Sequence, residues 1–349
     1  AYTQGLKTLK YSVTVEMIAR PAIRLGIVII LFLVGLRLFG VIFGSVASYL
    51  IGALLAYHFA RRISPFDYGE TPAQKLTKEI LTYSLPLVLA NFMNVIIIRS
   101  DIIMLGFFKD STSTGIYGAT QILTPFVSLS LISFSKIFAP VASELWETKR
   151  KEELGEHLKT ISKWTLSIGL PVFLLYQLYA PTLLTIFGSE FAHGAKSLRI
   201  LATGQLINAA VGPVGFLLVM TGRQKLNLVN SVVVAVSNII LNALFIPRWG
   251  IEGAALATAI STSTVNIARV IQVKAIYGFT PFRKNFAKPV IAGAISYVAF
   301  MAVNYYLGWS GVGYIFILCG AFLTLYLVLS YLLGLKDEIE LIKEIISRR

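Results

Sequence analysis

The polar residues with the greatest chemical potential lie inside segments that are otherwise apolar. Asp101 stands in the run Ile98-Arg99-Ser100-Asp101, between long stretches of aliphatic residues. A carboxylate in the hydrocarbon of a membrane is costly, so it normally binds a cation or proton or pairs with a positive charge. Asp101 is therefore the leading candidate for an ion-coupling group. The alternative is an ion pair that holds two helices together, although Arg99 lies two residues away and does not point the same way on a helix.

Helical spacing groups the polar residues around Asp101 into two stripes. The first stripe holds Tyr83, Asn91, Asn94 and Asp101, and the second holds Tyr117, Gln121, Thr124, Ser128 and Ser135. At 100° per residue the stripes occupy sectors of about 80° and about 60°. Two such stripes on neighbouring helices predict one wall of a water-filled cleft. Helix packing through small polar residues is the alternative for the serines and threonines.

Later polar stripes favour packing between helices. They are formed by Asn227, Ser231, Asn238 and Asn242, and by Thr258, Thr262 and Arg269. Asparagines in such number more often link helices within a membrane bundle than contact a substrate. We therefore leave these residues out of the expected substrate site.

The chain offers little for metal, nucleotide or hydrolytic chemistry. His58, His157 and His193 are scattered without the spacing of metal ligands, so we expect no metal and no cofactor. The sequence contains no Walker phosphate-binding loop, which excludes ATP as a direct energy source. A membrane enzyme such as a glycan polymerase is disfavoured because the outer segments are short. We therefore expect a protein that is not an enzyme.

The elements that carry these residues are apolar and long. Hydrophobic residues make up 56% of the sequence and charged residues 14%, whereas a soluble domain carries about 25% charged residues. Only helices and closed barrels satisfy their backbones inside a bilayer, and the runs are too uniformly apolar for barrel strands. The sequence therefore predicts an all-α polytopic membrane protein with about ten transmembrane helices of some 20 residues each. The expected helices span 17–35, 41–60, 79–106, 114–137, 160–180, 195–221, 226–246, 251–272, 289–307 and 312–335.

The basic residues fall in every second gap between the apolar runs. Of the 31 Lys and Arg residues, 25 lie on the same side of the membrane as the segment before the first helix. Five lie on the opposite side, and Arg99 lies inside a helix. Positive charge gathers on the cytoplasmic side of membrane proteins. The pattern therefore predicts a multi-pass protein of the cell membrane with both ends of this chain in the cytoplasm. Basic loops beside anionic lipid also account for the net charge of +14, so no nucleic-acid partner is expected.

Several motifs resemble those of a known family. They are Ile246–Thr258 (IPRWGIEGAALAT), Tyr83-Ser84-Leu85-Pro86, Asp101-Ile102-Ile103-Met104-Leu105-Gly106, Gly115-Ile116-Tyr117-Gly118-Ala119 and Met220-Thr221-Gly222-Arg223-Gln224. Together they cover most of residues 79–272 in a consistent order. They resemble the Wzx-type polysaccharide biosynthesis flippases, which belong to the superfamily of multidrug, oligosaccharidyl-lipid and polysaccharide exporters.

The resemblance implies a two-lobed fold of fourteen helices, of which this chain would hold the last ten and lack the first four. The expected organisation is the remainder of the first lobe (1–60), a cytoplasmic linker (61–78), a six-helix second lobe (79–272), a second linker (273–288), two C-terminal helices (289–335) and an amphipathic cytoplasmic tail (336–349).

The resemblance also implies a function, which is the translocation of a lipid-linked oligosaccharide or polysaccharide repeat unit by alternating access. The expected partners are this glycan lipid, the membrane lipids and a proton or sodium ion. Arg99 would neutralise part of the substrate's pyrophosphate and Asp101 would couple the ion. The candidate cavity and coupling residues are Asn91, Asn94, Arg99, Asp101, Tyr117, Gln121, Thr124 and Ser128. A cation-coupled multidrug or metabolite exporter of the same superfamily is the alternative.

Overall fold

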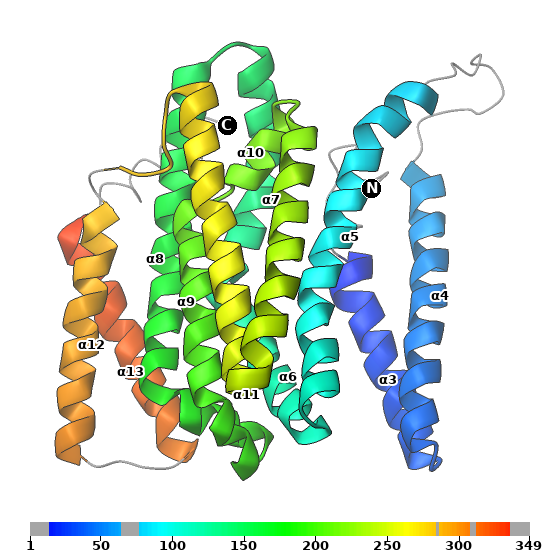
Figure 1. Ribbon diagram of the computed structural model, residues 1–349, viewed down its shortest axis with the longest axis vertical. Coiled ribbons are helices and arrows are strands. Elements are labelled where there is room, and N and C mark those ends of the chain that lie inside the picture. Colours follow the sequence, from blue (N-terminus) through cyan, green and yellow to red (C-terminus); the bar gives the residue numbers. More distant parts are fainter. Residues whose placement is uncertain (1–13, 64–76, 284–285, 308–311, 336–349) are drawn as a thin grey trace. The chain divides into compact units, whose positions relative to one another are not determined.

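The computed structural model describes residues 14–63, 77–283, 286–307 and 312–335, and every regular element within these ranges is a helix (Figure 1). This confirms the predicted all-α class. The chain divides into two compact units at residues 76 and 77. The predicted linker 61–78 lies largely outside the described residues, and the predicted tail 336–349 lies entirely outside them.

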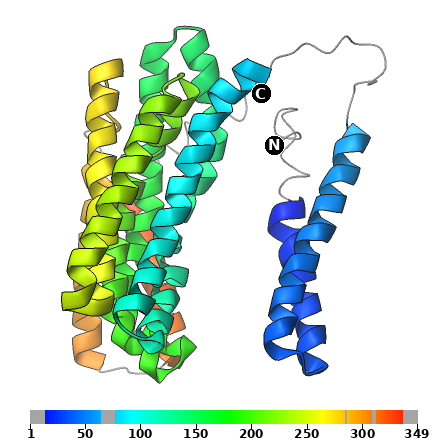
Figure 2. The same cartoon turned by 45° about the vertical axis from the view of Figure 1, so that its right-hand side comes forward.

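The first unit is a helical hairpin. Its elements are the π-helix η1 (Thr14–Ala19), α3 (Arg20–Leu33) and α4 (Arg37–Ile63). The chain reverses at Gly35, whose φ is +90°, a value that glycine adopts without steric cost. The two helices then run side by side (Figure 2). The Arg20 guanidinium lies 4.6 Å from the ring centre of Tyr49, which links the start of α3 to the middle of α4.

The second unit is a helical bundle. Its elements are α5 (Thr77–Phe108), α6 (Ser111–Leu123), η2 (Thr124–Ser128), α7 (Leu129–Glu147), α8 (Lys151–Leu184), η3 (Thr185–Phe187), η4 (Ser189–Gly194), α9 (Ala195–Val211), α10 (Val214–Met220), α11 (Gln224–Tyr277), α12 (Ala287–Leu307), α13 (Val312–Ser330) and η6 (Tyr331–Leu335). The α5–α6 turn and the bend in α11 lie at one end of this unit, which we call the Gly250 end (Figure 1). The α7–α8 turn lies at the other, which we call the Lys149 end.

The helix predicted over 114–137 is interrupted at a proline. The structure replaces it with α6, the 3-10 segment η2 and α7, which together cover residues 111–147. Pro125 lies in the first turn of η2 and has no N–H to donate. The chain tightens there into the 3-10 form, which is common in short helical pieces. The polar stripe that begins at Tyr117 is therefore divided among α6, η2, which holds Thr124 and Ser128, and α7.

α11 contains two helices that were predicted separately. A straight helix of its 54 residues would be about 80 Å long, more than twice the thickness of bilayer hydrocarbon. The bend is at Gly250, with φ +55° and ψ −129°. Two limbs leave this residue and lie side by side (Figure 1). They correspond to the predicted helices 226–246 and 251–272.

The helix predicted over 195–221 is broken as well. Gly212, with φ +72°, and Pro213 separate α9 from α10, and the two segments are bent by 46°. A Cβ on Gly212 would lie 2.0 Å from the Ser162 hydroxyl oxygen on α8, so only glycine fits at this crossing. The break brings the backbone of α9 against α8.

The described helices suit a membrane. Seven of them are long and apolar enough to cross it, or eight if the bent pair α9 and α10 is one span. α11 counts once among these although it has two limbs, and α3, with 14 residues, is too short to count by length. Large aliphatic side chains on the first limb of α11, such as Val229, Val233 and Ile240, are exposed. Lipid is the natural neighbour for such a surface.

Candidate functional site

Asp101 is the centre of a buried polar cluster in the second unit. Its side chain is 0% exposed. The Tyr117 hydroxyl donates to Oδ2 at 2.7 Å, the Thr258 hydroxyl donates to the same oxygen at 2.6 Å, and Nδ2 of Asn242 donates to Oδ1 at 2.6 Å. These donors come from α6 and from both limbs of α11. Donors from α6, which follows α5 directly, and from the two limbs of α11, more than 140 residues after Asp101, therefore converge on one carboxylate.

A second layer of amides continues the cluster. Nδ2 of Asn242 also donates to Oδ1 of Asn238 at 3.0 Å, and Nδ2 of Asn238 donates to the Thr258 hydroxyl at 2.9 Å. The Ser100 hydroxyl donates to the same Asn238 oxygen at 2.9 Å. Oδ1 of Asn242 is buried and has no hydrogen-bond partner among the described residues. An orphaned acceptor beside a carboxylate leaves unused capacity for a positively charged ligand.

The local sequence explains why these groups meet. Asn238 and Asn242 are four residues apart and so share a face of the first limb of α11. The reversal at Gly250 places Thr258 opposite that face. Leu105, Ile246 and Ala254 are buried in an apolar cluster with Tyr117, and this cluster holds α5 and α6 against both limbs.

The chemistry of the cluster is that of a carboxylate surrounded by neutral donors. None of the ion pairs found between described residues includes Asp101. Three donors stabilise the ionised carboxylate, but an isolated buried charge remains unfavourable. A proton, or a small cation held by carboxylate, amide and hydroxyl oxygens, would complete the site. Among the described residues no group of three His, Cys, Asp or Glu side chains is placed to hold a metal.

The other predicted site residues lie in different settings. Arg99 and Asn91 are exposed on α5, and the side chain of Asn94 lies outside the described part of the chain. Thr124 and Ser128 are buried, and the Ser128 hydroxyl donates to Oε1 of Gln205 at 2.9 Å. Among the predicted residues whose side chains the structure describes, only Tyr117 forms a hydrogen bond with Asp101. The lining of a cleft by the remaining residues stays a prediction.

The residues that sequence reasoning left out are Asn238, Asn242 and Thr258. Their helical stripes were visible in the sequence and were interpreted as packing contacts. Packing alone does not describe them, because two of the three donate directly to the carboxylate of Asp101. The sequence did contain a signal that could have identified these residues as part of the site. Thr258 is the last residue of the Ile246–Thr258 motif, and the two asparagines lie one helical turn apart.

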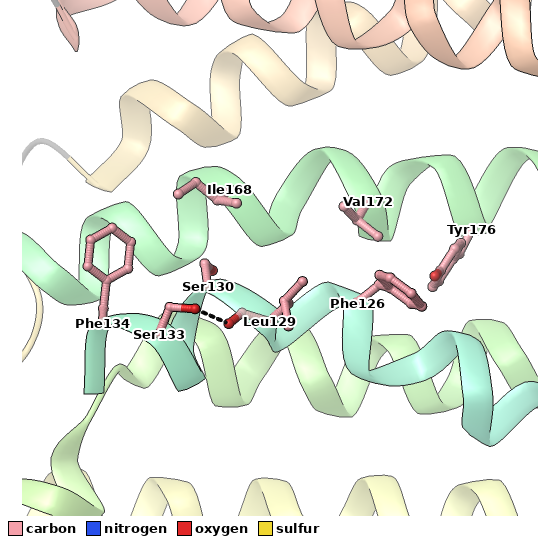
Figure 3. Close-up of a pocket in the computed structure, with 8 residues that line it drawn as sticks. All are labelled: Phe126, Leu129, Ser130, Ser133, Phe134, Ile168, Val172 and Tyr176. Carbon is pink, nitrogen blue, oxygen red and sulfur yellow. Dashed lines mark hydrogen bonds between the residues drawn. The ribbon is translucent and has the colours of Figure 1, made fainter. Parts of the chain in front are cut away.

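A groove of about 530 Å³ lies on the second unit between η2 and α7 on one side and α8 on the other (Figure 3). It is lined by Phe126, Leu129, Ser130, Ser133, Phe134, Ile168, Val172 and Tyr176. Its two serine hydroxyls are directed to backbone oxygens, Ser133 to Leu129 and Ser130 to Thr165. The groove is therefore apolar in character and separate from the Asp101 cluster.

Comparison with known proteins agrees with the all-α membrane fold. Residues 1–146 match the family described as "Polysaccharide biosynthesis protein", and residues 86–244 match the MatE family. The probable flippase AglR of Haloferax volcanii is 26% identical over 211 residues, which cover 59% of this chain and 44% of AglR. The chain spans less than half the length of AglR and of two further curated relatives.

Solved structures share the fold. The lipid II flippase MurJ in an inward closed conformation superposes with a TM-score of 0.66 at 20% identity, covering 92% of this chain and 67% of MurJ. The crystal structure of a MATE protein with a single substitution gives a TM-score of 0.62 at 15% identity, covering 75% of this chain and 61% of that structure. At these identities the likeness concerns the fold alone.

Fold and site together define a polytopic helical membrane protein with a buried carboxylate inside a helical bundle. The two family matches and the similarity to AglR confirm the resemblance of the chain to the superfamily of multidrug, oligosaccharidyl-lipid and polysaccharide exporters, as its motifs predicted.

Proposed function

We propose that this chain is part of a flippase that moves a lipid-linked oligosaccharide or polysaccharide repeat unit from the cytoplasmic to the outer leaflet of the cell membrane. The observation that carries the proposal is the match of residues 1–146 to the polysaccharide biosynthesis family. The fold by itself does not discriminate, because MurJ and MATE proteins share it. The similarity to AglR supports the same choice.

The Asp101 cluster gives this proposal a source of energy. A carboxylate that is buried among neutral groups binds a proton or cation more readily when the surrounding helices exclude water. Its ligands lie on α6 and both limbs of α11, so a change in packing between these helices and α5 changes ion affinity. Ion binding and helix movement are then linked, and the linkage acts in both directions. The ion would be a proton or sodium.

Arg99 has a separate role in the proposal. Its exposed position on α5 suits a group that meets the substrate's pyrophosphate from the side of the second unit. A guanidinium binds phosphate oxygens through two parallel N–H groups, which gives both strength and orientation.

A drug or metabolite exporter is the second candidate, and the MatE match over residues 86–244 favours it. The two candidates make different demands on the ligand. A flippase moves a glycan headgroup while the lipid tail remains in the bilayer, whereas an exporter releases a small amphipathic cation into water.

Reconstitution separates these candidates. The full-length protein is placed in vesicles that contain a fluorescent short lipid-linked oligosaccharide, and exposure of the glycan is followed with an impermeant lectin. We expect the glycan to appear on the opposite leaflet, and ethidium accumulation in the same vesicles to equal that in protein-free vesicles. Ethidium transport without glycan movement would contradict the flippase and support the exporter.

A further inference from the structure

A second polar chain runs through the second unit toward the Lys149 end and finishes at an arginine. Oδ1 of Asn208 on α9 accepts from Nδ2 of Asn266 at 3.0 Å, and Nδ2 of Asn208 donates to Oε1 of Gln205 at 3.4 Å. One turn beyond Asn266 on α11 is Arg269, which donates from Nη1 to Oδ1 of Asn266 at 3.3 Å. This chain shares no residue with the Asp101 cluster.

The half-buried guanidinium of Arg269 makes few and long hydrogen bonds. Its second contact is a donation from Nη2 to Oδ1 of Asn227, also at 3.3 Å. Both contacts are long for hydrogen bonds that involve a charged donor, which are usually about 2.7–2.9 Å. Nε of Arg269 is buried and has no hydrogen-bond partner among the described residues. The guanidinium therefore meets two neutral amides and keeps unused donors.

Within the described part of the chain, no carboxylate pairs with this charge. Among the residues from 195 to 277 the only acidic one is Glu252, which pairs with Lys196 at 2.5 Å near the Gly250 end. The ion pairs found between described residues join neither Glu144 nor Glu147, at the end of α7, to Arg269. Further positive charge stands on Arg223, at the start of α11. The region attracts anions.

Gly215 borders the space beside the Arg269 guanidinium. A Cβ built on Gly215 of α10 would lie 3.6 Å from Cζ of Arg269 and 3.6 Å from Oδ1 of Asn227. The natural residue has no side chain there, so the guanidinium borders on backbone. Arg269 itself lies eight residues before the end of α11 at Tyr277, or about 12 Å along the axis.

We propose that Arg269 is the centre of a binding site for the phosphate group of a lipid, reached from the Lys149 end of the second unit. A guanidinium with free donors in a low-dielectric setting binds phosphate oxygens strongly and with defined orientation. Asn227 and Asn266 hold the guanidinium in place. The site requires only a phosphate, and its assignment to the glycan lipid in place of an ordinary phospholipid rests on the proposed function.

Binding is measured directly on the purified full-length protein by native mass spectrometry. Undecaprenyl phosphate, phosphatidylglycerol and inorganic phosphate are the probes. We expect Arg269→Gln to raise the apparent Kd of the preferred lipid by about tenfold or more, the loss expected for a charge-assisted hydrogen bond. Lys274→Gln is the matched control, because it removes one exposed positive charge from the same helix. It should leave Kd within about twofold.

The three probes identify the source of the phosphate. Tighter binding of undecaprenyl phosphate than of phosphatidylglycerol assigns the site to the lipid-linked substrate, and equal binding assigns it to bulk phospholipid. In either case the phosphate site stands. Unchanged lipid affinity in Arg269→Gln, or equal losses in Arg269→Gln and Lys274→Gln, would overturn it. Because binding is read without transport, a failure of the proposed flippase activity leaves this result independent.

Folding of the variant is controlled by a second measurement. If Arg269 has no anionic partner in the ligand-free protein, then Arg269→Gln removes an uncompensated charge. The ligand-free variant should therefore unfold at the same temperature as the natural protein or at a higher one. Lipid should then stabilise the natural protein and not the variant. If Arg269→Gln does not fold, Arg269→Lys keeps the charge without the guanidinium fork and should bind lipid with intermediate affinity. Natural affinity in Arg269→Lys together with an unfolded Arg269→Gln would make the arginine structural and contradict the site.

Discussion

Asp101 combines complete burial with the absence of a cationic side chain among its described contacts. Its three hydrogen bonds are short, and the carboxylate is the acceptor in each of them, so they favour its ionised form. Desolvation opposes the same form. A bound proton or cation resolves this conflict, and the orphaned oxygen of Asn242 is positioned to take part. At the scale of the residue, the site is therefore expected to respond to ions.

The first prediction follows from this conflict. Raising sodium or lowering pH should raise the unfolding temperature of the purified protein, because an ion that binds only the folded state stabilises it. At an ion concentration a hundred times its dissociation constant the gain is about 2.7 kcal/mol. Asp101→Asn removes the charge and should abolish the response, as a thermal-shift titration would show.

Asp110→Asn provides the matched control. Asp110 is exposed at the N-cap of α6, outside the spans, and accepts from the backbone N–H of Ser113 at 2.6 Å, which holds the pKa of its carboxyl below the ordinary value. It is therefore ionised throughout the neutral range, and asparagine caps a helix equally well. Its variant should keep the full ion response. A response in Asp101→Asn equal to that of the natural protein would reject ion binding at the cluster.

At the scale of the element, the bend in α11 builds the site. Asn242 lies on the first limb and Thr258 on the second, and both donate to the same carboxylate. They meet because the chain reverses at Gly250 with φ +55° and ψ −129°, a combination that is almost restricted to glycine. Space is not the constraint at this residue, since the nearest described atom to a Cβ there would be Cε of Lys109 at 3.8 Å.

The second prediction tests that backbone requirement. Gly250→Ala should destabilise the protein by about 1–3 kcal/mol through strain at the bend. Gly320→Ala is the control, because Gly320 lies inside α13 with nothing within 4 Å of a Cβ and should be neutral or slightly stabilising. Thermal unfolding in detergent measures both variants. Equal unfolding temperatures for the two would show that the bend tolerates a side chain.

At the scale of the whole molecule, the distribution of charge predicts an orientation. The Lys149 end of the second unit carries Arg223 and Lys225 in the α10–α11 region, whereas Arg248 lies at the Gly250 end. Basic segments remain in the cytoplasm because their transfer is unfavourable and anionic lipid attracts them. The Lys149 end is therefore expected inside the cell.

The third prediction concerns this orientation. After Cys319→Ala removes the single natural cysteine, cysteines are introduced at two exposed positions by Arg248→Cys and Arg223→Cys. An impermeant thiol reagent should label the first in intact cells and the second only after permeabilisation. The opposite labelling pattern would invert the topology and place the Arg269 site on the outer side.

Much of the fold was predictable because membrane helices are dictated by local composition. Uninterrupted apolar runs leave the backbone no alternative to internal hydrogen bonds, so α4, α5, α8 and α12 were expected from their residues. The interruptions were less predictable. Pro125 converts one turn into a 3-10 segment, and Gly212 separates α9 from α10. These breaks were hard to predict because they depend on the contacts that the neighbouring helices allow.

Asp101 and Tyr117 were recognisable from the sequence alone, because a carboxylate in an apolar run carries a high energetic penalty wherever the helix packs. The sequence also determined the helical class, the family resemblance and the predicted orientation. Only the tertiary structure decided that Asn242 and Thr258 bind the same carboxylate, and that Arg269 meets neutral amides and pairs with no described carboxylate. The reason is physical: a periodic pattern shows which face of a helix is polar, whereas the partner of that face depends on turns and packing that bring distant segments together.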